Sequence, residues 1–347
     1  MKTIFRPRWQ LLLAVLLLSA SCAKEQIADT EWSIPTDEVR DGGPGKDGIP
    51  SVDNPQFSAA NEATYLSDND LVVGIVHGTE VKAYPHPILD WHEIVNDEVD
   101  GLAVAMTYCP LTGSGIAWDR ELDGEVTTFG VSGLLFESNL IPYDRKTNSN
   151  WSQMRLDCVN GPLQGQEINT FPIVETTWGT WKAMYPGTQV MTTETGFDRD
   201  YMRYPYGDYR TNDAYIIFPV TNPDDRLSEK ERVHGVIVGD QAKVYRFESF
   251  SNGTTVLAER FGGEEFVVVG NANENWIVSF RVNGDLGSFQ AVQGEGAIVM
   301  EDGAGNRYDV FGRVVEGPAT GTQLEATKSY IAYWFAWGTF FPGAEIF

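Results

Sequence analysis

The sequence predicts a mainly β fold of the α+β type, built as two pseudo-symmetric halves with a few short helices. Two observations lead to this prediction. Short runs of branched and aromatic residues recur along the chain between turns rich in Gly, Asn and Asp, which is typical of strands joined by hairpins. Several stretches of the first half also recur, in the same order, in the second half, as an internal duplication would leave them.

The recurring stretches define the two halves. Residues 74–84 (GIVHGTEVKAY) resemble 235–245 (GVIVGDQAKVY), 161–165 (GPLQG) resemble 317–321 (GPATG), and 178–187 (WGTWKAMYPG) resemble 334–343 (WFAWGTFFPG). We therefore expect copies at 68–191 and 230–347, with the first half beginning at residue 42 and the second half being structural. The Tyr-, Asp- and Arg-rich stretch 192–229 is expected to be an inserted loop region.

Local patterns predict particular elements within this plan. Residues 71–76 and 81–84 are expected to form a hairpin around a tight turn. A helix is predicted over 176–185, capped by Thr176 or Thr177 and stopped by a Pro-Gly pair. A second helix is predicted over 86–96, because its apolar residues repeat at helical spacing.

The N-terminus predicts export and a lipid anchor. Residues 1–21 combine basic residues, a short apolar run and small residues ahead of Cys22, which is typical of a signal peptide. We expect Cys22 to be lipidated and 22–41 to tether the body to a bacterial membrane, on its periplasmic or cell-surface face. The alternative is an ordinary signal peptide followed by an incidental cysteine.

The charge of the chain narrows its partners. With 25 Lys and Arg against 49 Asp and Glu, the formal net charge is −24. Such a chain repels nucleic acid and anionic lipid, so we expect no nucleic-acid partner and membrane contact only through the N-terminal lipid. A small molecule, a metal ion or an extracytoplasmic protein remain as possible partners.

His92 and Cys109 are the candidate reactive pair, because they lie close together in the sequence. One interpretation is a soft-metal or redox-accessory site, with copper or zinc held by both residues and by Met106 or Asp90. Another is a cysteine-dependent enzyme with Cys109 as nucleophile and His92 as base. Cys109 could instead be a buried apolar residue or form a disulfide with Cys158.

Polar residues after this pair are expected to line a ligand site. The loop after Cys109 offers backbone N–H groups for an anion, and amide or guanidinium side chains further along could bind a carbonyl or anionic group. The predicted ligand-binding residues are Gly113, Ser114, Ser132, Asn139, Asp144, Arg145, Ser152 and Gln153.

The second copy serves as a control for this site. The loop after Cys109 aligns with residues 271–275 (NANEN), which have neither Cys nor a Gly pair. His77 and His86 are expected in turns, and His234 has no partner that the sequence identifies. The polar residues of 90–115 therefore belong to one copy only, which favours a functional site there.

A set of motifs is spread along the chain, namely GGPGKDGIPSVDNP (42–55), AYP (83–85), WHEIVND (91–97), TYCPLTGSG (107–115), GVSGLL (130–135), YDR (143–145), WSQ (151–153) and YWFAW (333–337). At these motifs the chain resembles domain-of-unknown-function family 3179, a family of uncharacterised exported bacterial proteins. The resemblance implies that residues 42–55 belong to the domain, and it brings no established reaction. The family's loop usually reads C-P-L-C-G, whereas Thr112 stands at the second cysteine here, so this loop has no dithiol.

A third interpretation of the function is a non-catalytic surface module whose polar loop binds a glycan or a protein.

Overall fold

The computed structural model describes residues 31–282, 284 and 286–347, and this part of the chain is mainly β with a few short helices, as predicted. Residues 32–347 form one compact unit. Three α-helices are present in the described chain, namely α1 (His86–His92), α2 (Trp178–Met184) and α3 (Trp334–Phe340). Short 3-10 turns add η1 (Ala60–Glu62), η2 (Tyr209–Thr211), η3 (Phe247–Phe250) and η4 (Leu286–Ser288).

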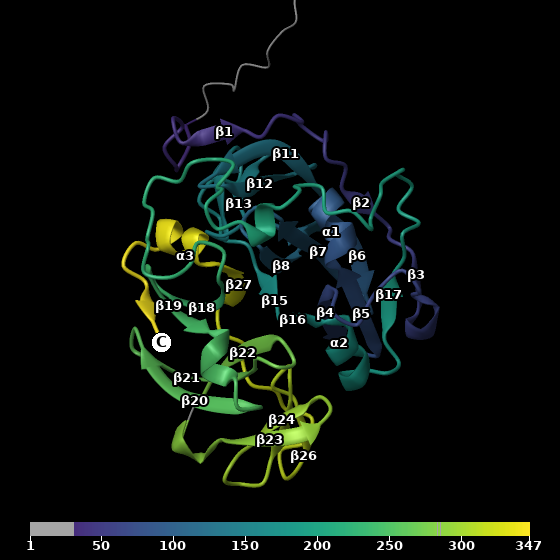
Figure 1. Cartoon of the computed structure of the whole chain (residues 1–347), viewed down its shortest axis with the longest axis vertical. Helices are drawn as coiled ribbons and strands as arrows, with labels where there is room; N and C mark the ends of the chain where they lie inside the picture. Colours follow the sequence, from purple (N-terminus) through teal and green to yellow (C-terminus); the bar gives the residue numbers. More distant parts are fainter. Residues whose placement is uncertain (1–30, 283, 285) are drawn as a thin grey trace, which may run out of the picture. The chain divides into compact units, whose positions relative to one another are not determined.

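Two sheets, one from each half, share a strand plan. In each, a hairpin gains an antiparallel strand on one side and a parallel strand on the other (Figure 1). The first sheet has the order β16-β4-β5-β17-β3, with β3 (Phe57–Ala59), β4 (Leu71–His77), β5 (Glu80–Pro85), β16 (Val174–Thr177) and β17 (Gln189–Met191). The second has the order β27-β18-β19-β28, with β18 (Arg232–Val238), β19 (Gln241–Arg246), β27 (Ser329–Tyr333) and β28 (Glu345–Ile346).

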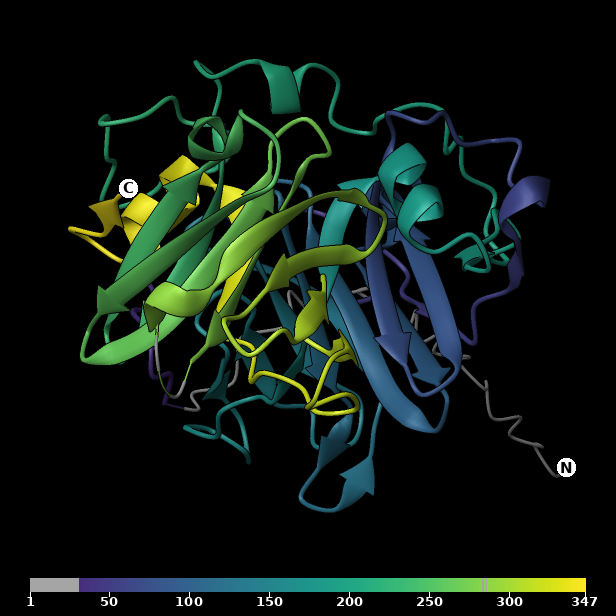
Figure 2. The same cartoon turned by 90° about the horizontal axis from the view of Figure 1, so that it is seen from below.

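A tryptophan on a helix packs against a glycine of the hairpin in both sheets. A Cβ atom on Gly74 would lie 2.3 Å from the Trp181 ring, and one on Gly235 would lie 2.2 Å from the Trp337 ring. Glycine is therefore required at both positions, since any side chain would push the helix off the sheet. Figure 2 shows α2 and α3 beside their respective sheets on opposite sides of the view.

Further sheets, antiparallel apart from one parallel strand pair, complete the fold. The first half supplies the order β15-β8-β7-β6-β2 and the order β1-β11-β12-β13-β14, and the second half supplies β20-β21-β22 and β23-β24-β25-β26. The first-half strands are β1 (Val39–Asp41), β2 (Val52–Asp53), β6 (Ile94–Val99), β7 (Leu102–Cys109), β8 (Ser114–Asp119), β11 (Phe129–Phe136), β12 (Asn139–Asp144), β13 (Asn150–Ser152), β14 (Asp157–Asn160) and β15 (Thr170–Phe171), with the separate hairpin β9 (Glu121–Leu122) and β10 (Glu125–Val126). The second-half strands are β20 (Thr255–Phe261), β21 (Glu264–Asn271), β22 (Trp276–Arg281), β23 (Gln290–Glu295), β24 (Ile298–Glu301), β25 (Arg307–Asp309) and β26 (Val314–Glu316).

The two largest hydrophobic cores each combine residues of both halves. One joins Trp118 and Trp151 of the first half to Trp334 and Trp337 of the second. The other joins Trp178 and Trp181 of the first half to residues of the second-half sheets, including Trp276. Each helix-bearing sheet thus packs against strands of the other half, while two smaller cores do not combine the halves, one lying within residues 52–201 and the other within residues 236–277.

The N-terminal boundary differs from the sequence prediction. Residues 32–41 were expected in a tether, but Ile34 is buried and β1 pairs with the edge strand β11. An extended segment gains backbone hydrogen bonds at such an edge, and composition does not reveal this. The predicted signal peptide and Cys22 lie outside the described residues. No helix in the described part of the chain is long and apolar enough to cross a membrane.

Two helix predictions had different outcomes. The helix predicted over 176–185 is confirmed as α2, with the Thr177 hydroxyl accepting a hydrogen bond from the Thr180 backbone N–H. The helix predicted over 86–96 is too long, because Glu93 takes a left-handed φ of 57° and the β-branched residues after it form β6. Strand pairing there outweighs the helical spacing.

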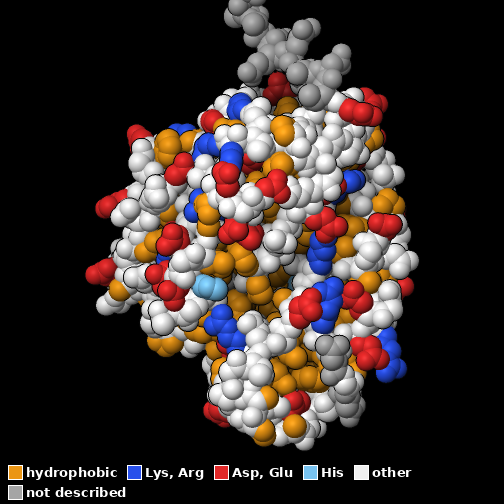
Figure 3. All heavy atoms as spheres, turned by 180° about the vertical axis from the view of Figure 1, so that it is seen from behind, with side chains coloured by type: hydrophobic (Ala, Val, Ile, Leu, Met, Phe, Trp, Pro, Cys, Tyr) orange, Lys and Arg blue, Asp and Glu red, His pale blue; other side chains and the backbone are white. Residues whose placement is uncertain are grey.

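Acidic side chains are spread over the face of the molecule shown in Figure 3, while hydrophobic side chains gather in a hollow near its centre. The stretch 192–229 contains only η2 among the described elements and runs across the molecule from β17 to β18 (Figure 1). This stretch, called the insertion below, positions the candidate site.

Candidate functional site

The short helix α1 places two titratable side chains on one face. It begins after Pro85, whose extended backbone ends β5, and it stops at Glu93. His86 and Asp90 lie one turn apart at i and i+4, so they share a face. Both are 5% exposed, which is unusual for an acidic residue.

Tyrosine hydroxyls of the insertion bind α1 and the loop after β7. Tyr201 is hydrogen-bonded to His92 (2.7 Å), and Tyr206 donates to the Glu93 carboxyl (3.3 Å). Tyr204 and Tyr209 donate to backbone oxygens of the 110–111 loop. These bonds explain the tyrosine content of the insertion and hold it over the site.

A cavity of about 460 Å³ lies between α1, the insertion and the start of β18. Ligand pockets commonly have this size and contain a few convergent polar groups. The polar residues that line it include His86, Asp90, Tyr204, Arg210, Lys230, Arg232 and Tyr333. Basic side chains are concentrated here in a chain whose overall charge is strongly negative.

Asp90 is the most perturbed acid in this cavity. Its carboxyl group accepts no hydrogen bond from any described residue, and burial raises its pKa to about 7 although the nearby Arg210 lowers it. Arg210 is exposed and stacks on Tyr204, with 4.5 Å between its guanidinium carbon and the ring centroid. A carboxyl with this pKa changes protonation at neutral pH, as acid–base groups of binding and catalytic sites do.

His86 stands between Asp90 and a second buried acid. Its Nε2 lies 3.8 Å from Oε2 of Glu175, and neither atom has a hydrogen-bond partner in the described chain. Burial, with help from Arg232 and Arg210, holds the pKa of His86 well below its usual range, so the imidazole is neutral. Arg232 donates to the other carboxyl oxygen of Glu175 at 2.6 Å and to Asn275 at 2.7 Å.

No hydrogen bond joins the side chains of His92 and Cys109, and each is hydrogen-bonded to other residues of the described chain. Both imidazole nitrogens of His92 are occupied, Nδ1 by the Pro50 carbonyl at 2.8 Å and Nε2 by Tyr201. Cys109 is 1% exposed and its sulfur lies 3.7 Å from the Ser138 carbonyl oxygen. The pairing of His92 with Cys109 therefore stays a prediction of the sequence.

Glu93 is a titratable neighbour of Cys109. Burial and the Glu93 carboxyl raise the pKa of the Cys109 thiol to about 11, so the thiol is protonated at neutral pH. Burial also raises the pKa of Glu93 to about 7. Cys109 and Cys158 are both free and buried. The part of the chain that the structure describes holds no group of three or more His, Cys, Asp or Glu side chains that could hold a metal ion.

Four of the predicted ligand residues satisfy one another or pack instead of facing a ligand. Gln153 accepts from Ser114 (2.7 Å) and Asn139 (2.7 Å) and donates to Thr107 (3.0 Å). Asn139 also donates to Thr112 at 2.9 Å. Gly113 takes a φ of 60°, and a side chain there would meet the Tyr333 ring. This buried network, Thr107–Thr112–Ser114–Asn139–Gln153, joins the loop after β7 to β12.

The remaining predicted ligand residues have local roles. Buried Asp144 accepts bonds from Thr147, Ser149 and the Trp151 indole, and Ser132 bridges a bulge in β11. Arg145 is not paired with Asp144, and instead pairs with Asp47 and Asp53 of the 42–55 segment. The side-chain hydroxyl of Ser152 is buried and has no hydrogen-bond partner in the described chain.

Sequence reasoning missed His86, Tyr204, Arg210 and Arg232 as site residues. The His-x-x-x-Asp spacing of 86–90 was a usable signal, since it places both side chains on one helical face. Arg232 could not have been found, because it reaches this cavity from the other half of the chain.

The fold and site define a mainly β protein with a buried, titratable pocket beside the junction of its halves. The chain belongs to a family of proteins of unknown function, DUF3179, whose model matches residues 46–344. No curated protein and no solved structure matches the chain.

Proposed function

We propose that the cavity around Asp90 binds a small molecule with an anionic group, and that Asp90 exchanges a proton with it. The observation that carries this proposal is the Asp90 carboxyl itself. It is buried in a cavity wall, has no hydrogen-bond partner in the described chain, and has a pKa raised to about 7. Burying such a group opposes folding, so its presence is best explained by a ligand.

The surrounding charges favour a carboxylate or phosphate group on the ligand. Arg210 forms no ion pair in the described chain and is exposed at the cavity, so its guanidinium is available. Arg232 already neutralises Glu175. A protonated Asp90 can donate a hydrogen bond to the ligand's oxyanion, whereas an ionised Asp90 repels it. Neutral His86, one turn away, adds a further group that can donate or accept.

Binding of small acids at two pH values tests this proposal. Acetate, lactate, succinate and inorganic phosphate would be titrated into the protein at pH 6 and pH 8 and followed by calorimetry or NMR. At least one should bind, with affinity about tenfold lower at pH 8, because the fraction of protonated Asp90 falls about tenfold across that range.

Variants separate this mechanism from general charge effects. Asp90→Asn should remove the pH dependence, while Arg210→Gln should weaken binding at both pH values. Asp68→Asn is the matched control, because Asp68 is an exposed acid paired with Lys182 outside the cavity. Failure of every acid to bind, or an unchanged pH dependence in Asp90→Asn, would contradict the proposal.

We also propose that the two halves arose by duplication and that the chain is an exported lipoprotein. The shared strand plan and the Gly–Trp contacts in both sheets support the first point. The second rests on the N-terminal sequence, and the intact mass of the mature protein tests it. An unlipidated N-terminus beyond Cys22 would exclude the lipid anchor.

A copper or zinc site, or a cysteine nucleophile, at Cys109 and His92 stays a prediction of the sequence, as does a glycan- or protein-binding surface. The contacts of those two residues favour neither chemistry, and the Asp90 cavity is the better supported site.

A further inference from the structure

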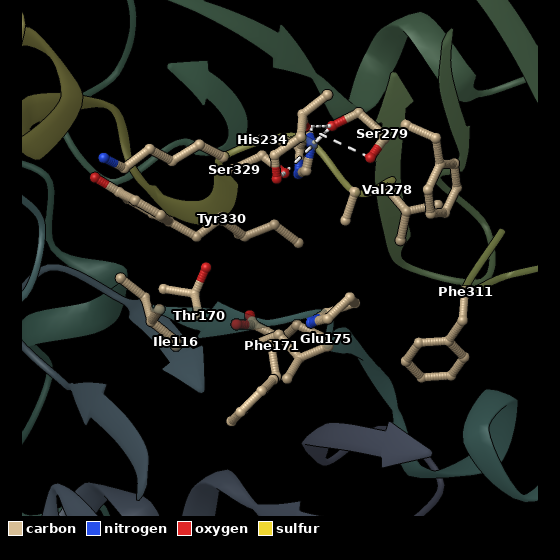
Figure 4. Close-up of a pocket in the computed structure, with 18 of the residues that line it drawn as sticks. Ile116, Thr170, Phe171, Glu175, His234, Val278, Ser279, Phe311, Ser329 and Tyr330 are labelled. Atoms are coloured by element: carbon tan, nitrogen blue, oxygen red, sulfur yellow. Dashed lines mark hydrogen bonds between the residues drawn. The ribbon is translucent and has the colours of Figure 1, made fainter. Parts of the chain in front are cut away.

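A second and larger cavity, of about 740 Å³, lies between the two halves. Strands β8, β15 and β16 of the first half form one side, and β18, β22 and β27 of the second half form the other. Figure 4 shows His234, Ser279 and Ser329 on one wall, with Thr170, Phe171 and Glu175 on the opposite wall. Only Glu175 is shared with the Asp90 site, where its other oxygen binds Arg232.

Polar and charged residues form about half of the lining of this cavity, and apolar side chains form the rest. The side chains come from both halves, so the surface is formed only when the halves are assembled. They include Ile116, Phe171, Val278, Phe311, Tyr330 and Ile331. Such apolar side chains favour the apolar body of a ligand, because transfer of apolar surface out of water is favourable.

His234 supplies a polar group with unused hydrogen-bonding capacity. It is 3% exposed, and its Nε2 is hydrogen-bonded to the Ser279 hydroxyl at 2.8 Å. Its Nδ1 is buried and has no partner in the described chain. The Ser279 hydroxyl is also hydrogen-bonded to Thr327 at 2.5 Å and lies 3.2 Å from Ser329. A buried nitrogen left unpaired opposes folding, so a ligand group that hydrogen-bonds to it would be stabilised in the cavity.

The charge state of the two walls limits the ligand's own charge. Burial lowers the pKa of His234 to about 3, so the imidazole is neutral at physiological pH and offers a hydrogen bond without a positive charge. Oε2 of Glu175, on the opposite wall, is also buried without a partner. A neutral hydroxyl or amide fits this pair of walls better than an anion does, because a carboxylate beside Glu175 would be repelled.

We infer that this cavity is a second binding site, for an uncharged small molecule with an apolar body and a hydroxyl or amide group that hydrogen-bonds to His234 Nδ1. The site is independent of the proposed function, which concerns an anionic ligand at Asp90. A ligand in this cavity would explain why His234, for which the sequence suggests no partner, is buried between the halves.

Three small aromatic probes test the inference on the intact protein. Benzyl alcohol, toluene and benzoate would be titrated while saturation transfer to the ligand and the ring ¹⁵N shifts of His234 are recorded. Benzyl alcohol should bind about tenfold more tightly than toluene, which corresponds to one hydrogen bond, and benzoate should bind most weakly. Only benzyl alcohol should shift the Nδ1 resonance.

Two variants locate the binding. Thr170→Trp, at an exposed cavity-wall position, should abolish binding of benzyl alcohol by filling the space. Val126→Trp is the matched control, because Val126 is an exposed strand residue outside the cavity, and it should bind as the wild type does. His234→Phe should make benzyl alcohol and toluene bind equally, and the Nδ1 shift in the wild type serves if that variant does not fold.

Several outcomes would overturn the inference. In the first two, the wild type binds none of the probes up to their solubility limits, or it binds benzyl alcohol and toluene equally. In the next two, benzoate binds most tightly, or benzyl alcohol still binds to the Thr170→Trp variant. An unchanged Nδ1 resonance on addition of benzyl alcohol would mean that the nitrogen is satisfied by water only and would equally exclude the site.

Discussion

The hairpin β7–β8 of the first half and the hairpin β21–β22 of the second occupy equivalent places in the strand order, yet their surroundings differ. In the first half, α1 precedes the hairpin and brings His86, Asp90 and Glu93 into the interior. In the second half, η3 takes that place with two phenylalanines at its ends. The loop of the second hairpin instead supplies Asn275, which binds Arg232 beside the first half's cavity.

This difference shows which features the fold needs and which it only tolerates. The Gly–Trp contacts occur in both halves, so packing accounts for them. Acids on a buried helix occur in one half, and the other half holds the same strand plan without them. The buried acids are therefore not required by the shared strand plan, and this supports the proposal of a site around Asp90.

The largest expected effect tests the shared packing. Trp181→Ala and Trp337→Ala should each lower the free energy of unfolding by about 3–5 kcal/mol, because each removes a fully buried indole. Urea unfolding of both variants measures the loss. Similar losses in the two variants would support equivalent packing roles for the two tryptophans. A loss below about 1 kcal/mol for one of them would show that the two contacts are not equivalent.

The next effect concerns Asp90 and depends on pH. Its raised pKa means that the folded protein binds a proton more tightly than the unfolded chain, so its contribution lowers stability as pH rises from about 4 to about 7. Asp90→Asn should remove that loss and make the variant more stable than the wild type at pH 8, by up to about 4 kcal/mol.

Thermal or urea unfolding from pH 4 to pH 8 measures this difference. In the control variant Asp68→Asn, the free energy of unfolding should depend on pH as it does in the wild type. A variant that is no more stable than the wild type at pH 8 would mean that Asp90 is not a destabilising buried acid.

A smaller effect is expected in the polar network. Gln153→Ala should cost about 1–3 kcal/mol, because it removes the buried hydrogen bonds that Gln153 makes with Asn139, Ser114 and Thr107. Asn271→Ala, at the matching hairpin end of the second half, should cost less, because its side chain bonds mainly to its own loop. Chemical denaturation measures the free energy of unfolding of both variants. A larger loss for Asn271→Ala than for Gln153→Ala would contradict this prediction.

The smallest effect is expected at Cys109. Native protein at pH 7 should show no alkylation of Cys109 by iodoacetamide on a timescale that labels a free peptide thiol, since the thiol is buried and its pKa is about 11. Mass spectrometry with and without denaturant measures this. Rapid labelling of the folded protein would revive the interpretation of Cys109 as a nucleophile.

The sequence predicted the β-rich class, the first hairpin and helix α2, because turn residues, strand periodicity and the cap at Thr177 are local signals. It pointed to residues 90–115, which contain Asp90, but it selected His92 and Cys109 as the reactive pair, which stays a prediction. The bonds of His92 to Pro50 and Tyr201 depend on segments distant in the sequence. Arg232 and Tyr333 come from the other half, and no spacing rule links them to α1.

The most direct test of the central claim is a pH titration of the Asp90 carboxyl carbon by ¹³C NMR, with Asp90→Asn used to assign the resonance. The account predicts a midpoint near pH 7 in the free protein, moved upward when an acid binds beside the carboxyl group. A midpoint near pH 4, as in an exposed aspartate, would contradict the claim that Asp90 is the buried proton-exchanging group of the site.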